Sequence, residues 1–139
     1  NIPPIASAVG LLHDIGRVVL LHQMPDLCRQ VAAAQVEQPQ VAVEELERTI
    51  LGVSHQEVGG YLLDWWGLPQ PIIESAMFHH NPCHESVTDH QLVSIVHIAS
   101  HYSSKLLRPN SKGKMDERAL GILDISQETC ERLIRDIRK

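Results

Sequence analysis

The stretch that decides the fold is GLLHDIGR, residues 10–17. It places an adjacent histidine and aspartate, His13 and Asp14, inside an apolar run of helical character. An ionisable pair is expensive to bury unless each member has a partner. A neutral imidazole beside a carboxylate offers nitrogen and oxygen ligands to a divalent cation. The pair therefore predicts either a metal centre or a buried hydrogen-bonded pair at a helix crossing, and the rest of the sequence must supply the other ligands.

The composition is that of one domain built from helices. The chain has 139 residues, of which 43% are hydrophobic and only 4% aromatic, so the core depends on aliphatic side chains. No segment shows the period-two alternation of a strand. The sequence predicts an all-α fold, a single helical domain over residues 1–139.

Charge and cysteine content exclude several classes of function. The formal net charge is −5, which repels DNA, and the sequence offers no dense basic stripe. Basic residues near the C-terminus alternate with Glu131 and Asp136 and indicate a solvated helix face. Three cysteines without a CxxC spacing indicate free thiols in a reducing cytoplasm. We find no membrane span and no signal peptide, and we expect a cytoplasmic protein without a membrane partner.

Cap and break signals divide the chain into seven predicted helices. Ser54 and Glu57 form a capping box, Gly52 and Gly67 end helices, and Ser126 begins the last one. The predicted helices cover residues 5–22, 26–36, 43–51, 55–66, 72–80, about 89–107 and 126–137, with a polar loop at 108–114. Gly10 and Gly16 lie inside the first helix, where each costs about 1 kcal/mol relative to Ala unless close packing requires it.

For two of the helices, the sequence predicts how large side chains are arranged around the helix axis. Val58, Tyr61, Leu62 and Trp65 recur at helical spacing in the helix that starts after Ser54. Neighbours on a helix do not share a face, so we expect one indole of Trp65 and Trp66 to face the core and the other the surface or an interface. In the helix near 89–107, we expect an inward face formed by Leu92, Val93, Val96 and Ala99.

Five side chains stand out as potential metal ligands. They are His13, Asp14, His55, His79 and His80. Helix ends in a bundle commonly converge on one side of the core, so separate helices can direct ligands to one point. Adjacent residues on a helix diverge by about 100°. Each adjacent pair therefore serves one centre only if the helix unwinds there, or if two metals lie side by side. The other histidines, His22, His84, His90, His97 and His101, are interpreted as surface residues or hydrogen-bonded core residues.

Four motifs in combination resemble the HD superfamily of metal-dependent phosphohydrolases. They are GLLHDIGR (10–17), LGVSHQEVGGYLL (51–63), WGLP (66–69) and HHNP (79–82). The pattern is most similar to the HDOD branch, the HD-related output domain of bacterial signalling proteins, and runs from about Ala6 to Ser104. The resemblance implies an HD-domain-like helical bundle that lacks the upstream helices of the full domain. A first residue that is not Met, with His13 so early, indicates a C-terminal fragment of a larger protein.

The resemblance also implies a ligand set, from which this chain departs. In the HD family the His-Asp pair acts with an upstream histidine and a later aspartate, and the HD-GYP branch adds a lysine and further histidines. Carried over by motif, His13 and Asp14 are the central ligands, His55, His79 and His80 match the additional histidines, and Arg17 replaces the lysine as a candidate phosphate contact. Ser100 stands at the expected aspartate position. Serine is a weak, neutral ligand that does not replace a bridging carboxylate.

These departures leave two main functions in competition, beside a helical interaction domain in which His13 and Asp14 are only a buried hydrogen-bonded pair. The first is a signal-transduction output domain, for example of a response regulator, which is non-catalytic and keeps a degenerate metal site. Its partners are then an upstream sensor or receiver domain of the same chain and a signalling protein, with a homodimer left open. The second is a metal-dependent phosphohydrolase that acts on a nucleotide or a cyclic dinucleotide. The cofactor is either a divalent transition metal (Zn, Fe, Mn or Ni) or none.

Overall fold

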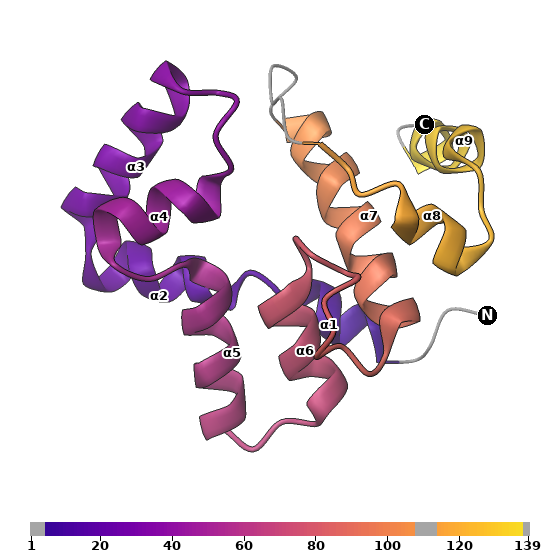
Figure 1. Cartoon of the computed structure of the whole chain (residues 1–139), viewed down its shortest axis with the longest axis horizontal. Helices are drawn as coiled ribbons and strands as arrows, with labels where there is room; N and C mark the ends of the chain where they lie inside the picture. Colours follow the sequence, from indigo (N-terminus) through magenta and orange to yellow (C-terminus); the bar gives the residue numbers. More distant parts are fainter. Residues whose placement is uncertain (1–4, 108–113, 138–139) are drawn as a thin grey trace.

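The computed structural model describes residues 5–107 and 114–137. Within them the chain forms nine helices and no strand (Figure 1), so the predicted all-α fold is confirmed. The helices are α1 (Ala6–Leu12), α2 (Ile15–Gln23), α3 (Pro25–Glu37), α4 (Val43–Leu51), α5 (His55–Trp65), α6 (Gln70–Phe78), α7 (His90–Leu107), α8 (Arg118–Leu123) and α9 (Gln127–Ile137). Except for Lys114, the predicted polar loop lies outside the described residues. No described helix has the length and apolar character that a membrane crossing requires.

The predicted helix over residues 5–22 is interrupted at the His-Asp pair. α1 ends at Leu12 and α2 begins at Ile15, and Asp14 between them has φ −104° and ψ 14°. These angles lie outside the helical range. The prediction of one continuous helix is therefore wrong at this point. The break is the unwinding that two neighbouring ligands need in order to face the same centre.

α2 crosses α5 through two glycines. A Cβ atom on Gly16 would lie 1.9 Å from the carbonyl oxygen of His55 and 2.7 Å from the amide nitrogen of Gly59. Both neighbours are backbone atoms, so a side chain at Gly16 would force the helices apart. A Cβ on Gly10, by contrast, would meet nothing within 4 Å. Close packing therefore explains Gly16 and does not explain Gly10.

The helix boundaries near the candidate ligands follow the predicted caps. The hydroxyl of Ser54 accepts a hydrogen bond from the amide of Glu57, and the Glu57 carboxylate accepts one from the amide of Ser54. Gly52 and Gly67 have φ of 79° and 70°, in the left-handed region that glycine enters readily. This capping box fixes the start of α5, where His55 is the first helical residue.

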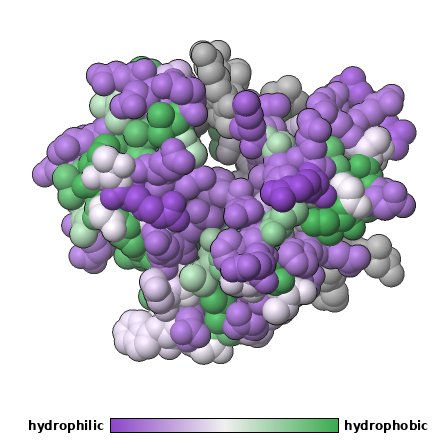
Figure 2. All heavy atoms as spheres, in the orientation of Figure 1, coloured by the Kyte–Doolittle hydropathy of each residue, from purple (hydrophilic) through white to green (hydrophobic). Residues whose placement is uncertain are grey.

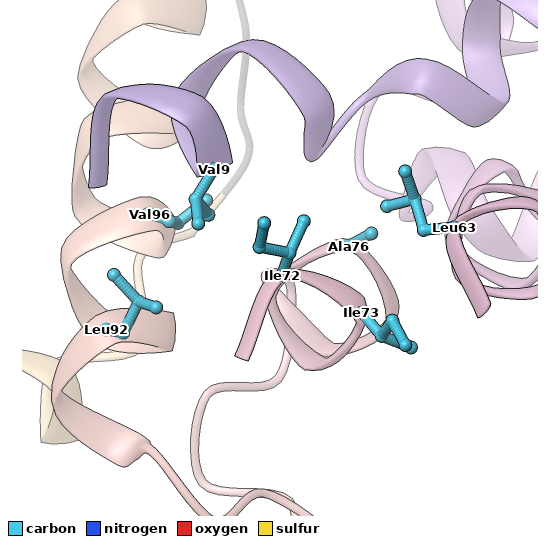
Figure 3. Close-up of a cluster of buried hydrophobic side chains, with 7 residues drawn as sticks. All are labelled: Val9, Leu63, Ile72, Ile73, Ala76, Leu92 and Val96. Atoms are coloured by element: carbon cyan, nitrogen blue, oxygen red, sulfur yellow. The ribbon is translucent and has the colours of Figure 1, made fainter. Parts of the chain in front are cut away.

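The main core joins α1, α5, α6 and α7. Figure 3 shows its seven buried side chains, which are Val9, Leu63, Ile72, Ile73, Ala76, Leu92 and Val96. Burying one side chain of this size stabilises the fold by about 1.5–3 kcal/mol. Since α6 contributes three of the seven, its position against α1 and α7 is fixed. The end of α6, where His79 and His80 follow, is fixed with it.

A second cluster holds the C-terminal helices against α7. Ile98, Tyr102, Ala119 and Cys130 are its buried members. They come from α7, α8 and α9, and α8 was not predicted from the sequence. α8 is only six residues long, too short to show helical periodicity by itself.

The prediction that one tryptophan faces the core is wrong, and the predicted inward face of α7 is partly wrong. Trp65 and Trp66 are 83% and 55% exposed, so neither indole is in the core. The buried face of α5 consists of His55, Gln56, Gly59, Gly60 and Leu63. α5 packs through small residues that allow close approach, and its aromatic side chains point to solvent. On α7, Ala99 is exposed, whereas the other three predicted inward residues are buried.

Candidate metal centre

The structure brings all five predicted ligands together. They lie at the break between α1 and α2 (His13, Asp14), at the start of α5 (His55) and just after α6 (His79, His80). α5 and α6 lie side by side and antiparallel, so the start of one is beside the end of the other (Figure 1). The imidazole centroid of His79 lies 4.2 Å from that of His80, 4.9 Å from that of His13 and 5.5 Å from that of His55.

The carboxylate of Asp14 lies among the imidazoles. Its Oδ1 is 3.5 Å from His55 Nε2 and 3.5 Å from His79 Nε2, and its Oδ2 is 3.6 Å from His13 Nε2. Two groups offer ligand atoms that lie within 4.8 Å of one another, and they share one histidine. The first group is His13, Asp14 and His79, and the second is His55, His79 and His80. Convergence is thus established, while metal ligation stays a prediction.

In three of the histidines, Nδ1 is held by an oxygen acceptor. Nδ1 of His13 lies 2.8 Å from the Gly10 carbonyl, and that of His79 lies 3.0 Å from the Ala76 carbonyl. Nδ1 of His55 lies 2.5 Å from Oε2 of Glu47. Because these oxygens accept hydrogen bonds, Nδ1 carries the proton and Nε2 presents a lone pair to the centre. Metal-ligating histidines are oriented in this way by their surroundings.

His79 provides the strongest local test of whether a metal fits. Its side chain is fully buried, and Nε2 has no hydrogen-bond partner within the described residues. Burial lowers the pKa of His79 to about 4, so the imidazole is neutral at pH 7. Burial and the neighbouring His79 lower the pKa of His80 to about 2. A buried lone pair without a donor is costly, and a cation in front of it supplies the missing partner. The donor set fits a divalent transition metal.

Glu47 belongs to the site but was not identified from the sequence. It is 5% exposed, and its Oε2 accepts hydrogen bonds from both the backbone amide and Nδ1 of His55. The sequence did contain a signal for the burial of Glu47. It lies four residues from each of Val43 and Leu51, so the three residues share one helix face, and the two apolar residues indicate that this face points inward.

Arg17 directs its guanidinium into the same cluster. Its Nε donates to Oδ1 of Asp14 at 3.0 Å, and one terminal nitrogen lies 3.8 Å from Oε1 of Glu47. The other terminal nitrogen lies 3.3 Å from Nε2 of His55 and donates to that lone pair. Arg17 therefore contacts both carboxylates and competes with a metal for His55. Its predicted role as a phosphate contact stays a prediction.

The ionised side chains of the cluster have a net negative charge. Burial opposes the ionisation of Asp14, but His79 and the charge of Arg17 hold the pKa of Asp14 well below its usual range. Burial also opposes the ionisation of Glu47, whose pKa the hydrogen bonds from His55 lower. Two carboxylates and one guanidinium together give a net charge of −1. A divalent cation near Asp14 is therefore electrostatically favourable.

α7 contributes a structural histidine rather than a carboxylate. Ser100 is half-buried on α7 and brings no charge to the site. Three residues earlier, the buried His97 lies with Nδ1 2.7 Å from the His79 carbonyl, and its Nε2 accepts the amide of Asp116 at 2.8 Å. His97 thus links the centre to the segment before α8. Like His22, His84, His90 and His101, it is absent from both ligand groups formed by the described residues.

Comparisons with known proteins show which sequences the chain resembles. The family model described as "HDOD domain" matches residues 3–82. A protein of Treponema pallidum (strain Nichols), described as "Uncharacterized protein", is 33% identical over 91 residues. That alignment covers 66% of this chain and 18% of the relative, so the chain spans less than a fifth of the relative's length. No solved structure matches the chain significantly. The family match includes all five predicted ligands and ends before α7 and Ser100.

Proposed function

The chain belongs to the HDOD family, and from that premise we propose that it is a non-catalytic output domain of a bacterial signalling protein. In this proposal the His-Asp centre binds one divalent transition metal, which stabilises the domain and does not hydrolyse a phosphoester. The input comes from a sensor or receiver domain of the same protein, and the output is contact with a signalling partner. The observation that carries the non-catalytic part is the position of Arg17.

Arg17 works against hydrolysis in two ways. Hydrolysis at a metal centre requires an open coordination position for water, and in the HD family carboxylates balance the metal charge. Here the guanidinium of Arg17 is bound to Asp14 and donates to Nε2 of His55, a nitrogen that a catalytic metal would need. An arginine also stays protonated at every relevant pH. The family resemblance implies an aspartate at the position of Ser100. Without it, Asp14 is the one carboxylate among the five candidate ligands.

The same geometry supports metal binding in the ligand group that does not include His55, the histidine that Arg17 contacts. His13, Asp14 and His79 form a group of two imidazoles and one carboxylate. When bound, a metal in this group supplies Lewis acidity and a positive charge beside Asp14. The three residues come from the α1–α2 junction and from the end of α6. A shared ion therefore links these segments. A displacement of α1 by a neighbouring domain would then also shift the end of α6.

A metal-dependent phosphohydrolase is the second candidate. It is favoured by the convergence of all five ligands with three Nδ1 atoms held by oxygen acceptors. In that case the second group, His55, His79 and His80, holds an additional ion after Arg17 moves.

A hydrolysis assay separates the two candidates. The protein is loaded separately with Zn²⁺, Fe²⁺, Mn²⁺ and Ni²⁺ and offered bis(p-nitrophenyl) phosphate and a cyclic dinucleotide. We expect no turnover above that of the Asp14→Asn variant in any metal. Circular dichroism verifies that both proteins are folded. Metal-dependent turnover that Asp14→Asn abolishes contradicts the non-catalytic proposal and establishes the phosphohydrolase.

A further inference from the structure

A groove beside the metal centre runs between α4, α5 and the end of α6 with the segment that follows it. Its volume is about 440 Å³. α4 contributes Glu44, Glu45 and Arg48, α5 contributes Gln56, Glu57 and Tyr61, and the remaining lining residues are Met77, Phe78, His80, Asn81 and His84. Figure 2 shows hydrophilic side chains gathered over α4 and the start of α5 on this face. Because His80 lines the groove, the groove reaches the histidine cluster.

The rim of the groove is acidic. Arg48 forms an ion pair with Glu57 at 3.3 Å, which leaves Glu44 and Glu45 on the same helix. In the part of the chain that the structure describes, no basic side chain pairs with either of them. The electrostatic field at the rim is therefore negative, and it attracts cations and repels phosphates.

Aromatic rings line the same groove and extend beyond it. Phe78 stacks on the imidazole of His84 at 4.5 Å. Glu57, Tyr61 and Trp65 follow one another at intervals of four residues along α5, so they form one row. Tyr61 is 69% exposed and Trp65 is 83% exposed. Three of the chain's five aromatic residues therefore lie in the groove or on its continuation.

Carboxylates beside open aromatic faces fit one kind of ligand. A Lys or Arg side chain gains an ion pair with a glutamate and a cation–π contact with a ring. The methylene groups of such a side chain pack on apolar surface such as Met77. A nucleotide would find aromatic faces for its base but carboxylates where its phosphates must lie. The charge of the rim therefore decides between these ligands.

We propose that this groove binds a basic peptide segment of a protein partner, with Lys or Arg side chains held by Glu44 and Glu45 and stacked on Tyr61. The inference rests on the proposed function in one respect, since it gives the chemistry of the partner that an output domain contacts. The binding itself requires neither metal nor turnover.

Tryptophan fluorescence measures the binding directly, because Trp65 and Trp66 are the chain's two tryptophans. The probe is an acetylated and amidated peptide of alternating Arg and Ala with four Arg residues, titrated in the presence of a chelator. We expect saturable binding that weakens with added salt. The Glu44→Gln/Glu45→Gln variant should bind about fivefold more weakly. Tyr61→Leu should lose about threefold, whereas Tyr61→Phe should bind like the parent protein.

The matched control is Glu37→Gln/Glu128→Gln, which removes two charges from α3 and α9, away from the groove. Equal weakening in the two double variants overturns the proposal, because the attraction would then follow net charge. Tighter binding of the corresponding Glu-Ala peptide, or of AMP, also overturns it. If the protein hydrolyses phosphoesters and also binds the peptide as predicted, the proposed function is contradicted and the groove proposal stands. If it hydrolyses no phosphoester and does not bind the peptide, only the groove proposal is contradicted.

Discussion

At the scale of single residues, the centre depends on groups that orient the ligands. The sequence was sufficient to single out five candidate ligands that the structure brings together, because their motifs are local and the resemblance is specific. It did not reveal Glu47, whose role depends on α4 lying next to the start of α5, eight residues along the chain from His55. It also did not reveal that Arg17 reaches across to His55, since that contact spans 38 residues. The contact between Arg17 and His55 follows from packing and has no local signature.

Glu47 should be far more important for stability than its neighbour Glu44. Glu47→Ala removes the acceptor for two His55 donors and leaves the Arg17 charge with one carboxylate fewer. Breaking a buried charged network typically costs about 3–5 kcal/mol. Urea unfolding with a chelator present measures the loss. Glu44→Ala, on the groove side of the same helix, is the control and should change the unfolding free energy by less than about 0.5 kcal/mol. A loss in Glu47→Ala as small as that expected for Glu44→Ala would show that the Glu47 contacts contribute little.

The metal-free protein should lose stability below neutral pH because of His79. Its pKa is about 4 in the folded protein, against an ordinary value of 6.5. Between these values the unfolded chain binds a proton that the folded protein does not, so stability rises with pH across this window and is fully present above it. Unfolding free energies measured in chelator from pH 5 to 6.5 test this. The slope should be smaller in His79→Asn, and an unchanged slope would exclude His79 as its source.

At the scale of helices, the sequence predicted caps well and faces less well. The capping box at Ser54 and the glycine ends at Gly52 and Gly67 were correct because each depends on a few adjacent residues. The break at Asp14 was missed because nothing in its local propensity interrupts a helix. The expectation that one tryptophan faces the core was wrong because α5 packs through Gly59 and Gly60 rather than through its aromatic residues.

The crossing of α2 and α5 should depend on Gly16. In Gly16→Ala the new methyl group would overlap the His55 carbonyl, so the helices must separate. Overpacking of this kind costs about 1–3 kcal/mol or more. Gly10→Ala is the matched control on α1, where the methyl group meets nothing within 4 Å. It should raise stability by about 0.5–1 kcal/mol through helix propensity. Thermal unfolding of both variants measures the difference, and equal effects would contradict close packing at Gly16.

At the scale of the whole molecule, two clusters of apolar side chains share α7. The first joins α7 to α1, α5 and α6 and fixes the helix ends that carry the ligands. The second joins α7 to α8 and α9, beyond the end of the family match. His97 lies between them and hydrogen-bonds to His79 on one side and Asp116 on the other. The centre is thus connected to both parts of the described chain through one helix.

The central claim is that His13, Asp14 and His79 form a metal-binding centre. The most direct test is elemental analysis after dialysis against equal concentrations of Zn²⁺, Fe²⁺, Mn²⁺ and Ni²⁺ and then against metal-free buffer. The account predicts about one tightly bound transition-metal ion per chain. That ion should be absent from Asp14→Asn and His79→Gln and retained in the control His22→Gln. A folded protein that retains no metal, or one whose metal content is unchanged in Asp14→Asn and His79→Gln, would contradict the account.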